Sequence, residues 1–123
     1  MTITLIQAEK AYRALDTLNN QLLPCRIAKA ICDNRNELKD QIDFLIMEEK
    51  KIVEAYGATL IDNNSYKVVE DDDKNLEFIA KVRELHEMDV DIPITKIPEN
   101  ELCSCAKIRP SEYDDIKFMI ENE

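Results

Sequence analysis

Glycine is nearly absent from this chain of 123 residues, in which Gly57 is the only one. Walker-type and dinucleotide-binding loops each require two or three glycines, because their backbone must approach phosphates closely. Both classes of nucleotide site are therefore excluded. Prolines number only four, and strand-rich folds generally spend glycine on their turns. This composition favours long helices.

Long apolar runs are also missing. No window approaches the roughly 18 uncharged apolar residues that a membrane span requires. Glu9 and Lys10 fall where a signal peptide would be apolar. Hydrophobic residues nevertheless make up 45% of the chain, which is too many for a disordered protein. We expect a single helical domain over residues 1–123, located in the cytoplasm and without a membrane partner.

The net charge of −10 is unevenly distributed along the chain. Residues 1–69 carry 10 acidic and 9 basic side chains, whereas residues 70–123 carry 16 acidic and 7 basic ones. Nucleic-acid affinity rests on Lys and Arg side chains that neutralise phosphates, so we expect no direct nucleic-acid binding. The candidate surface for a basic partner protein is the run Glu70, Asp71, Asp72 and Asp73. A solvated acidic surface that aids solubility is the competing interpretation.

Three segments have the apolar spacing of amphipathic helices. The first begins at a capping box formed by Thr4 and Gln7 and ends before Pro24, which is expected in the first turn of the next helix. That second helix covers residues 24–56 and stops at Gly57. The third follows the acidic run, since acidic side chains stabilise a helix N-terminus. Its predicted apolar face comprises Leu76, Ile79, Val82, Leu85 and Met88.

The second helix would be about 50 Å long, whereas a compact domain of this size has a radius of gyration near ~14 Å. Such a helix either kinks or projects and meets a partner. Its apolar stripe is interrupted between Ile31 and Leu38 by the polar segment 33–37. Two interpretations stay open: a kink in that segment, or a buried polar side chain that fixes the register at a homodimer seam.

The remaining segments predict short non-helical elements and one last helix. β-prone runs flank an Asn-rich turn within residues 58–69, which indicates a hairpin or an ordered excursion. Residues 90–98 alternate apolar and polar side chains, and their prolines permit only an edge strand or an extended arm. A capping box at Ser111 opens the last helix, with Tyr113, Ile116, Met119 and Ile120 facing inward. The predicted fold is mainly α, a helical hairpin or bundle built on one long helix.

The candidate metal ligands are Cys25, Cys32, Cys103 and Cys105. Disulfides are disfavoured in the cytoplasm, which leaves three interpretations: small buried hydrophobic residues, a structural zinc site, or a reactive pair. Segment 103–105 is expected to be non-helical and to offer two thiolates to one zinc ion. Cys25 and Cys32, if both helical, lie ~10 Å apart along the axis and could not share that ion. One of them would then join the other two thiolates and His86.

Candidate catalytic residues are scarce. His86 is the only histidine, and it lies beside the apolar face of the third helix, where packed or exposed histidines usually have no catalytic role. No carboxylate lies in an apolar run, where loss of water would raise its pKa. We therefore expect no enzymatic activity.

Several short segments together resemble known sequences. They are Leu22-Leu23-Pro24, Arg26-Ile27-Ala28-Lys29 with Asn34, Val53–Gly57, Glu84-Leu85, Val90-Asp91-Ile92, Ile108-Arg109-Pro110 and Phe118–Glu121. In this order, over nearly the whole chain, they resemble small proteins of phages and prophages of Gram-positive bacteria. The cysteines are not part of that pattern. A metal site would therefore be particular to this chain.

In size and charge the chain is similar to anti-CRISPR proteins, which block CRISPR effector nucleases of the Cas9 class. This resemblance implies an inhibitor that acts in the host bacterial cell by docking its acidic half on a basic nucleic-acid channel. The resemblance identifies no site residues in this chain. The alternative function is a virion protein that assembles the tail or the head.

Overall fold

The computed structural model describes residues 1–62 and 65–121. The chain is mainly helical, as predicted, and contains one long helix. The helices are α1 (Leu5–Asn19), α2 (Cys25–Tyr56), α3 (Asp72–His86), α4 (Glu99–Cys105) and α5 (Pro110–Ile116), followed by the 3-10 turn η1 (Lys117–Met119).

Short strands join and tie these helices. Strand β1 (Thr2–Thr4) pairs antiparallel with β4 (Asp89–Asp91), and β2 (Thr59–Leu60) pairs antiparallel with β3 (Tyr66–Lys67). Strand β5 (Ile97–Pro98) pairs in parallel with β6 (Ile120–Glu121). The hairpin predicted within 58–69 and the extended arm predicted over 90–98 are both confirmed. Asn63 and Asn64 of the predicted turn lie outside the described residues.

The ends of the first two helices follow local rules. Thr4 Oγ1 accepts the Gln7 N–H at 3.3 Å, and Gln7 Oε1 accepts the Thr4 N–H at 2.9 Å, which is the predicted capping box. Gly57 ends α2 with a φ of +63°, a left-handed conformation that suits a residue without Cβ. Pro24 lies just before α2 with extended backbone angles, so its predicted place inside the first turn is wrong.

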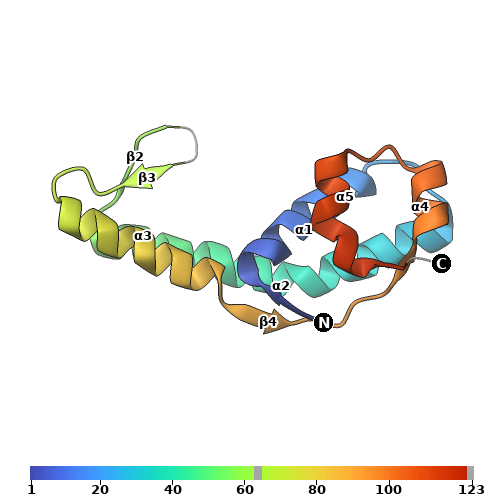
Figure 1. Cartoon of the computed structure of the whole chain (residues 1–123), viewed down its shortest axis with the longest axis horizontal. Coiled ribbons are helices and arrows are strands. Elements are labelled where there is room, and N and C mark those ends of the chain that lie inside the picture. Colours follow the sequence, from blue (N-terminus) through green and yellow to red (C-terminus); the bar gives the residue numbers. More distant parts are fainter. Residues whose placement is uncertain (63–64, 122–123) are drawn as a thin grey trace.

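Helix α2 connects two unequal parts of the molecule (Figure 1). It is helical over all 32 residues, and is therefore about 48 Å long. Its first half packs with α1, α4, α5 and the arm, and we call residues 1–42 and 89–121 the globular half. Its second half extends beyond most of these elements, with α3 and the β2–β3 hairpin beside it. Leu5 at the start of α1 belongs to the same buried cluster as Leu45 and Ile52 of this second half. We call residues 43–88 the projection.

The globular half holds the larger hydrophobic core. Helix α1 contributes three buried alanines, Ala8, Ala11 and Ala14, and small side chains let neighbouring helices approach closely. The fully buried large side chains around them come from the four helices of this half, from the arm with β5, and from η1: Leu15, Leu18, Ile27, Ile31, Leu38, Ile92, Ile97, Leu102, Ile116 and Met119. The inward positions predicted for the last helix are thus confirmed at Ile116 and Met119.

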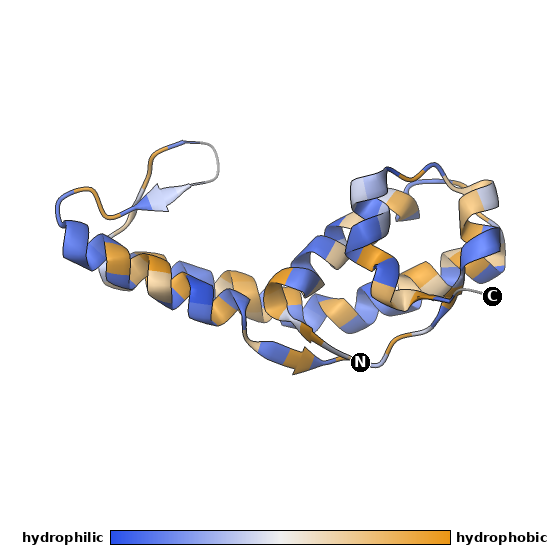
Figure 2. Ribbon diagram, in the orientation of Figure 1, coloured by the Kyte–Doolittle hydropathy of each residue, from blue (hydrophilic) through white to orange (hydrophobic). Residues whose placement is uncertain are grey.

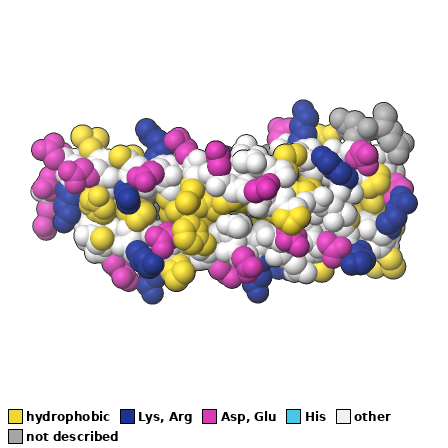
Figure 3. All heavy atoms as spheres, turned by 90° about the horizontal axis from the view of Figure 1, so that it is seen from below, with side chains coloured by type: hydrophobic (Ala, Val, Ile, Leu, Met, Phe, Trp, Pro, Cys, Tyr) yellow, Lys and Arg dark blue, Asp and Glu magenta, His cyan; other side chains and the backbone are white. Residues whose placement is uncertain are grey.

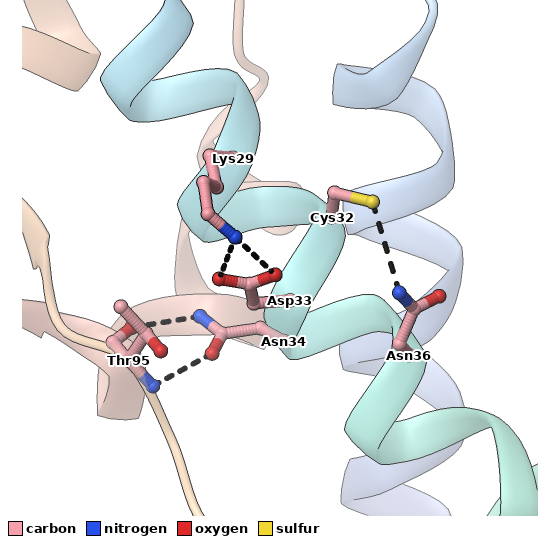
Figure 4. A network of polar contacts seen from close by, with 6 residues as sticks. All are labelled: Lys29, Cys32, Asp33, Asn34, Asn36 and Thr95. Carbon is pink, nitrogen blue, oxygen red and sulfur yellow. Dashed lines mark hydrogen bonds and ion pairs between the residues drawn. The ribbon is translucent and has the colours of Figure 1, made fainter.

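Asn34 fills the polar gap in the α2 stripe. Its side chain is 0% exposed, and its Nδ2 donates to the Thr95 carbonyl at 2.8 Å while its Oδ1 accepts the Thr95 N–H at 2.7 Å (Figure 4). The carboxamide therefore replaces the strand partner that this part of the arm lacks. Helix α2 continues through 33–37 without a break, and a bend of its axis in that segment stays a prediction. The buried polar side chain exists, but it pairs within the chain.

Two details of the C-terminal region differ from expectation. Helix α4 was not predicted, and it places residues 99–105 in a helix. Helix α5 begins at Pro110, with Glu112 Oε1 accepting the Arg109 N–H at 3.2 Å. Ser111 therefore lies inside the helix, and the predicted capping box at Ser111 is wrong. Proline at the first helical position explains this start, because its missing N–H would be unpaired there in any case.

Candidate functional site

The predicted partner-binding residues lie at the far end of the projection, where α3 begins (Figure 1). Glu70, Asp71, Asp72 and Asp73 are all exposed. Figure 3 shows acidic side chains gathered at this end of the molecule. The structure therefore brings these carboxylates together on one surface, where they can accept hydrogen bonds from Lys or Arg side chains of another molecule.

Part of this acidic cluster is explained by the helix itself. Asp71 is the N-cap of α3, and its Oδ1 accepts the Lys74 N–H at 3.0 Å. Asp72 and Asp73 occupy the first turn, where the positive end of the helix dipole stabilises negative charge. Any binding role must therefore be tested at Glu70, Asp72 and Asp73, leaving the Asp71 cap in place.

A groove of about 670 Å³ opens between α2 and α3 in the projection. The β2–β3 hairpin closes one of its sides. Its lining residues are Ile46, Glu49, Lys50, Val53 and Glu54 from α2, Ser65 and Tyr66 from the hairpin, and Phe78, Ile79, Val82 and His86 from α3. Figure 2 shows hydrophobic positions along both helices of the projection.

The packing face of α3 is rotated from the predicted one, and this rotation leaves apolar side chains along the groove. Leu85 is buried as predicted, and Val82 is partly buried. Phe78 and Leu85 are the buried residues of α3, and the Phe78 ring meets the Tyr56 ring edge-to-face with centroids 6.0 Å apart. Leu76 is 65% exposed and Ile79 is 43% exposed, so their predicted inward orientation is wrong. Met88 was also predicted to face inward, and this prediction is wrong because its side chain is exposed.

His86 connects the two helices at one wall of this groove. Its Nε2 lies 2.6 Å from Glu49 Oε1, and both side chains are partly exposed. The contact joins the last turn of α3 to the C-terminal third of α2. His86 is therefore a structural cross-link within the projection. The cysteines with which it was considered as a zinc ligand lie in the globular half.

The cysteines lie in helices of the globular half, and all four are exposed. The interpretation of buried hydrophobic residues is therefore wrong. The expected non-helical conformation of Cys103 and Cys105 is also wrong, because both lie in α4. Two residues apart on a helix, their side chains point in roughly opposite directions. Cys25 begins α2 and Cys32 follows two turns later, a spacing that cannot place both thiolates on one zinc ion.

The thiols have local partners. Cys105 Sγ lies 2.7 Å from the Glu101 carbonyl, and the Asn36 amide donates to Cys32 Sγ at 3.8 Å (Figure 4). Within residues 1–62 and 65–121, no three His, Cys, Asp or Glu side chains are grouped as metal ligands. The four predicted ligands are therefore not assembled into one site. A structural zinc stays a prediction, which metal analysis of the purified protein tests.

One titrating group in the globular half is perturbed. The Tyr113 hydroxyl donates to Glu99 Oε1 at 2.7 Å and so ties α5 to α4. This hydrogen bond, together with the negative charge of Glu99, raises the pKa of Tyr113 above its ordinary value. The contact is a structural tie rather than a binding site.

The sequence predicted the acidic surface but not the groove. A signal was present, because Ile46 and Val53 form a second apolar row seven residues apart beside the main stripe of α2. An apolar band that wide needs more than one covering helix. Comparison of the chain with protein-family models, curated proteins and solved structures found no match. None of the described helices combines the length and the apolar character needed to cross a membrane.

Proposed function

We propose that this chain is a non-catalytic inhibitor that binds a host defence nuclease, of the CRISPR effector class, through its acidic projection. The observation that carries the proposal is the uneven charge of the two parts. Residues 43–88 carry 12 acidic and 6 basic side chains, a net charge of −6 within about a third of the chain. The exposed carboxylates of Glu70, Asp72 and Asp73 extend this charge to the tip.

The physical basis is that the acidic projection and the nucleic acid compete for the same Lys and Arg side chains of the nuclease. A nuclease channel that holds nucleic acid is lined with Lys and Arg side chains, and an acidic protein surface complements that potential. Such contacts accelerate association and weaken as salt screens them. The resemblance to phage and anti-CRISPR proteins supplies the class of partner.

Assembly of the virion tail or head is the second candidate, and a different observation favours it. Ten large hydrophobic side chains are exposed among the described residues of the projection: Phe44, Ile46, Met47, Leu60, Ile61, Tyr66, Val69, Leu76, Ile79 and Met88. Contiguous exposed apolar surface commonly marks a face that another subunit covers. If this candidate is correct, deletion of the gene abolishes particle formation even in a host that lacks any defence nuclease.

The inhibitor proposal is tested with the triple variant Glu70→Gln, Asp72→Asn, Asp73→Asn. We expect binding to Cas9-class nucleases, and inhibition of their DNA cleavage, to weaken about tenfold at low salt, since three rim charges contribute roughly 0.5 kcal/mol each. The matched control neutralises three exposed acids of the globular half, Glu37, Asp40 and Glu121. Equal losses in both variants, or no loss in the first, would contradict the proposed surface.

A further inference from the structure

We propose that the groove between α2 and α3 binds an amphipathic helix with basic flanks, supplied by the partner protein. The partner helix would complete the projection as its third helix. This inference rests on the proposed function, whose binding surface it extends, and it names the element of the partner that the projection holds.

Among the described residues of the projection, one face of α2 has no covering layer. An amphipathic helix must bury its apolar stripe against other elements. In the globular half, α2 is covered by α1 and the arm, and Leu38 is 0% exposed. In the projection, α2 has α3 and the hairpin beside it, and Ile46 is 60% exposed only eight residues later. The buried stripe of α2 continues through Leu45 and Ile52, which are 1% and 7% exposed. Among the described residues, it is therefore the face beside this stripe, the face of Ile46, that no other element covers.

The apolar surface of the groove is elongated along α2. Its floor contains Phe78, which is buried, with Val53 and Val82 partly buried beside it, while Ile46 and Ile79 stand exposed at its edges. The lining of α2 runs from residue 46 to residue 54, about 12 Å along the helix axis. This length matches slightly more than two turns of a docked helix, which would present apolar side chains at positions i, i+4 and i+7.

Charge complementarity selects the partner. Glu49 and Glu54 line the groove, Lys50 lies between them in sequence, and Asp72 and Asp73 lie at the first turn of α3. Because residues 43–88 carry a net charge of −6, two copies of the chain would bring like charges together. A helix whose apolar face is bordered by Lys and Arg would instead satisfy both the groove and the surrounding carboxylates.

The test uses fluorescein-labelled helical peptides of about 18 residues, with leucine at i, i+4 and i+7 and lysine at most other positions. A matched set carries glutamate in place of lysine. Fluorescence anisotropy measures peptide binding to the full chain and to two double variants. Ile46→Gln, Ile79→Gln alters the groove, whereas Met47→Gln, Leu76→Gln alters comparably exposed apolar residues that do not line it. Circular dichroism verifies that both variants remain folded.

We expect the lysine peptides to bind and the glutamate peptides not to bind. The groove variant should lose about tenfold or more in affinity, since two buried isoleucine contacts are removed, whereas the control variant should change less than about twofold. Absent binding, or equal binding by both variants, would overturn the inference, because the second result indicates attraction by charge alone. Dissociation of a wild-type dimer by the groove substitutions would also overturn it and assign the groove to a second copy.

These outcomes are separable from the proposed function. Loss of groove-dependent peptide binding with nuclease inhibition retained would reject the helix and keep the inhibitor. Groove-dependent peptide binding by a chain that inhibits no nuclease would keep the helix and reject the inhibitor.

Discussion

The two ends of α2 lie in contrasting environments. In the globular half, side-chain contacts connect elements far apart in sequence: Asn34 pairs with Thr95, Gln21 pairs with Lys107, and Arg35 pairs with Asp16 at 2.8 Å. In the projection, His86 pairs with Glu49, and Asn75 Oδ1 accepts the Val68 N–H at 3.0 Å, while Ile46 and Met47 of α2 are more than half exposed. One continuous helix can therefore be part of a hydrophobic core at one end and leave much of its apolar surface exposed at the other.

The largest expected effect compares two positions on α2. Leu38→Ala removes a fully buried side chain and should lower the free energy of unfolding by about 2–5 kcal/mol. Met47→Ala, in the exposed part of the same helix, should change it by less than about 0.5 kcal/mol. Urea unfolding followed by circular dichroism measures both. Similar losses at the two positions would mean that the projection is as well packed as the globular half.

The second prediction concerns the contact between α2 and the arm. Asn34→Ala leaves the Thr95 N–H and carbonyl without their side-chain partner and should cost about 1–3 kcal/mol. Asn34→Leu should not restore stability, because leucine cannot make either hydrogen bond. Asn36→Ala, at an exposed position two residues on, serves as the control. A leucine variant as stable as the wild type would show that the arm is held by packing alone.

The third prediction separates capping from binding at the tip. Asp71→Ala should cost about 1 kcal/mol, because the Lys74 N–H loses its acceptor. Asp72→Asn should cost only a few tenths of a kcal/mol, through its interaction with the helix dipole. Hydrogen exchange of the α3 amides reads out both variants. Equal effects would indicate that Asp71 contributes charge and no specific cap.

The smallest expected effect is a pH dependence in the globular half. Because the pKa of Tyr113 is raised in the folded chain, the stabilisation from this tyrosine is present below its ordinary pKa. It is lost as the pH rises through the higher folded value. The alkaline absorbance titration of wild type minus Tyr113→Phe isolates this group. Glu99→Gln should shift its pKa back toward the ordinary value, and an unchanged titration would reject Glu99 as the cause.

The sequence was most informative where the determinants are local. Thr4 with Gln7 and the single Gly57 set the beginning of α1 and the end of α2 through contacts within one turn. The hairpin and the arm also followed from short patterns. Helix α4 was missed because its Cys103-Ser104-Cys105 segment follows Pro98 and lacks a clear apolar period.

Determinants that act between distant segments were not predictable. The pattern around Asn34 indicated a polar position in the stripe, but its partner Thr95 lies 61 residues away. The orientation of α3 was predicted from the spacing of its apolar residues. That spacing does not determine whether Phe78 or Ile79 packs against α2, and in the structure Phe78 is the buried one. The groove results from that choice, so it became visible only with the packing of the two helices.

Hydrogen exchange of the full chain, with and without the lysine peptide, tests most directly whether the projection is the binding end. Without peptide, amides of 44–56 and 72–86 should exchange faster than those of α1 and of α2 before residue 42. With peptide, protection should increase in 44–56 and 72–86 while α1 and α5 stay unchanged. Increased protection confined to the globular half, or none anywhere, would contradict the assignment of binding to the projection.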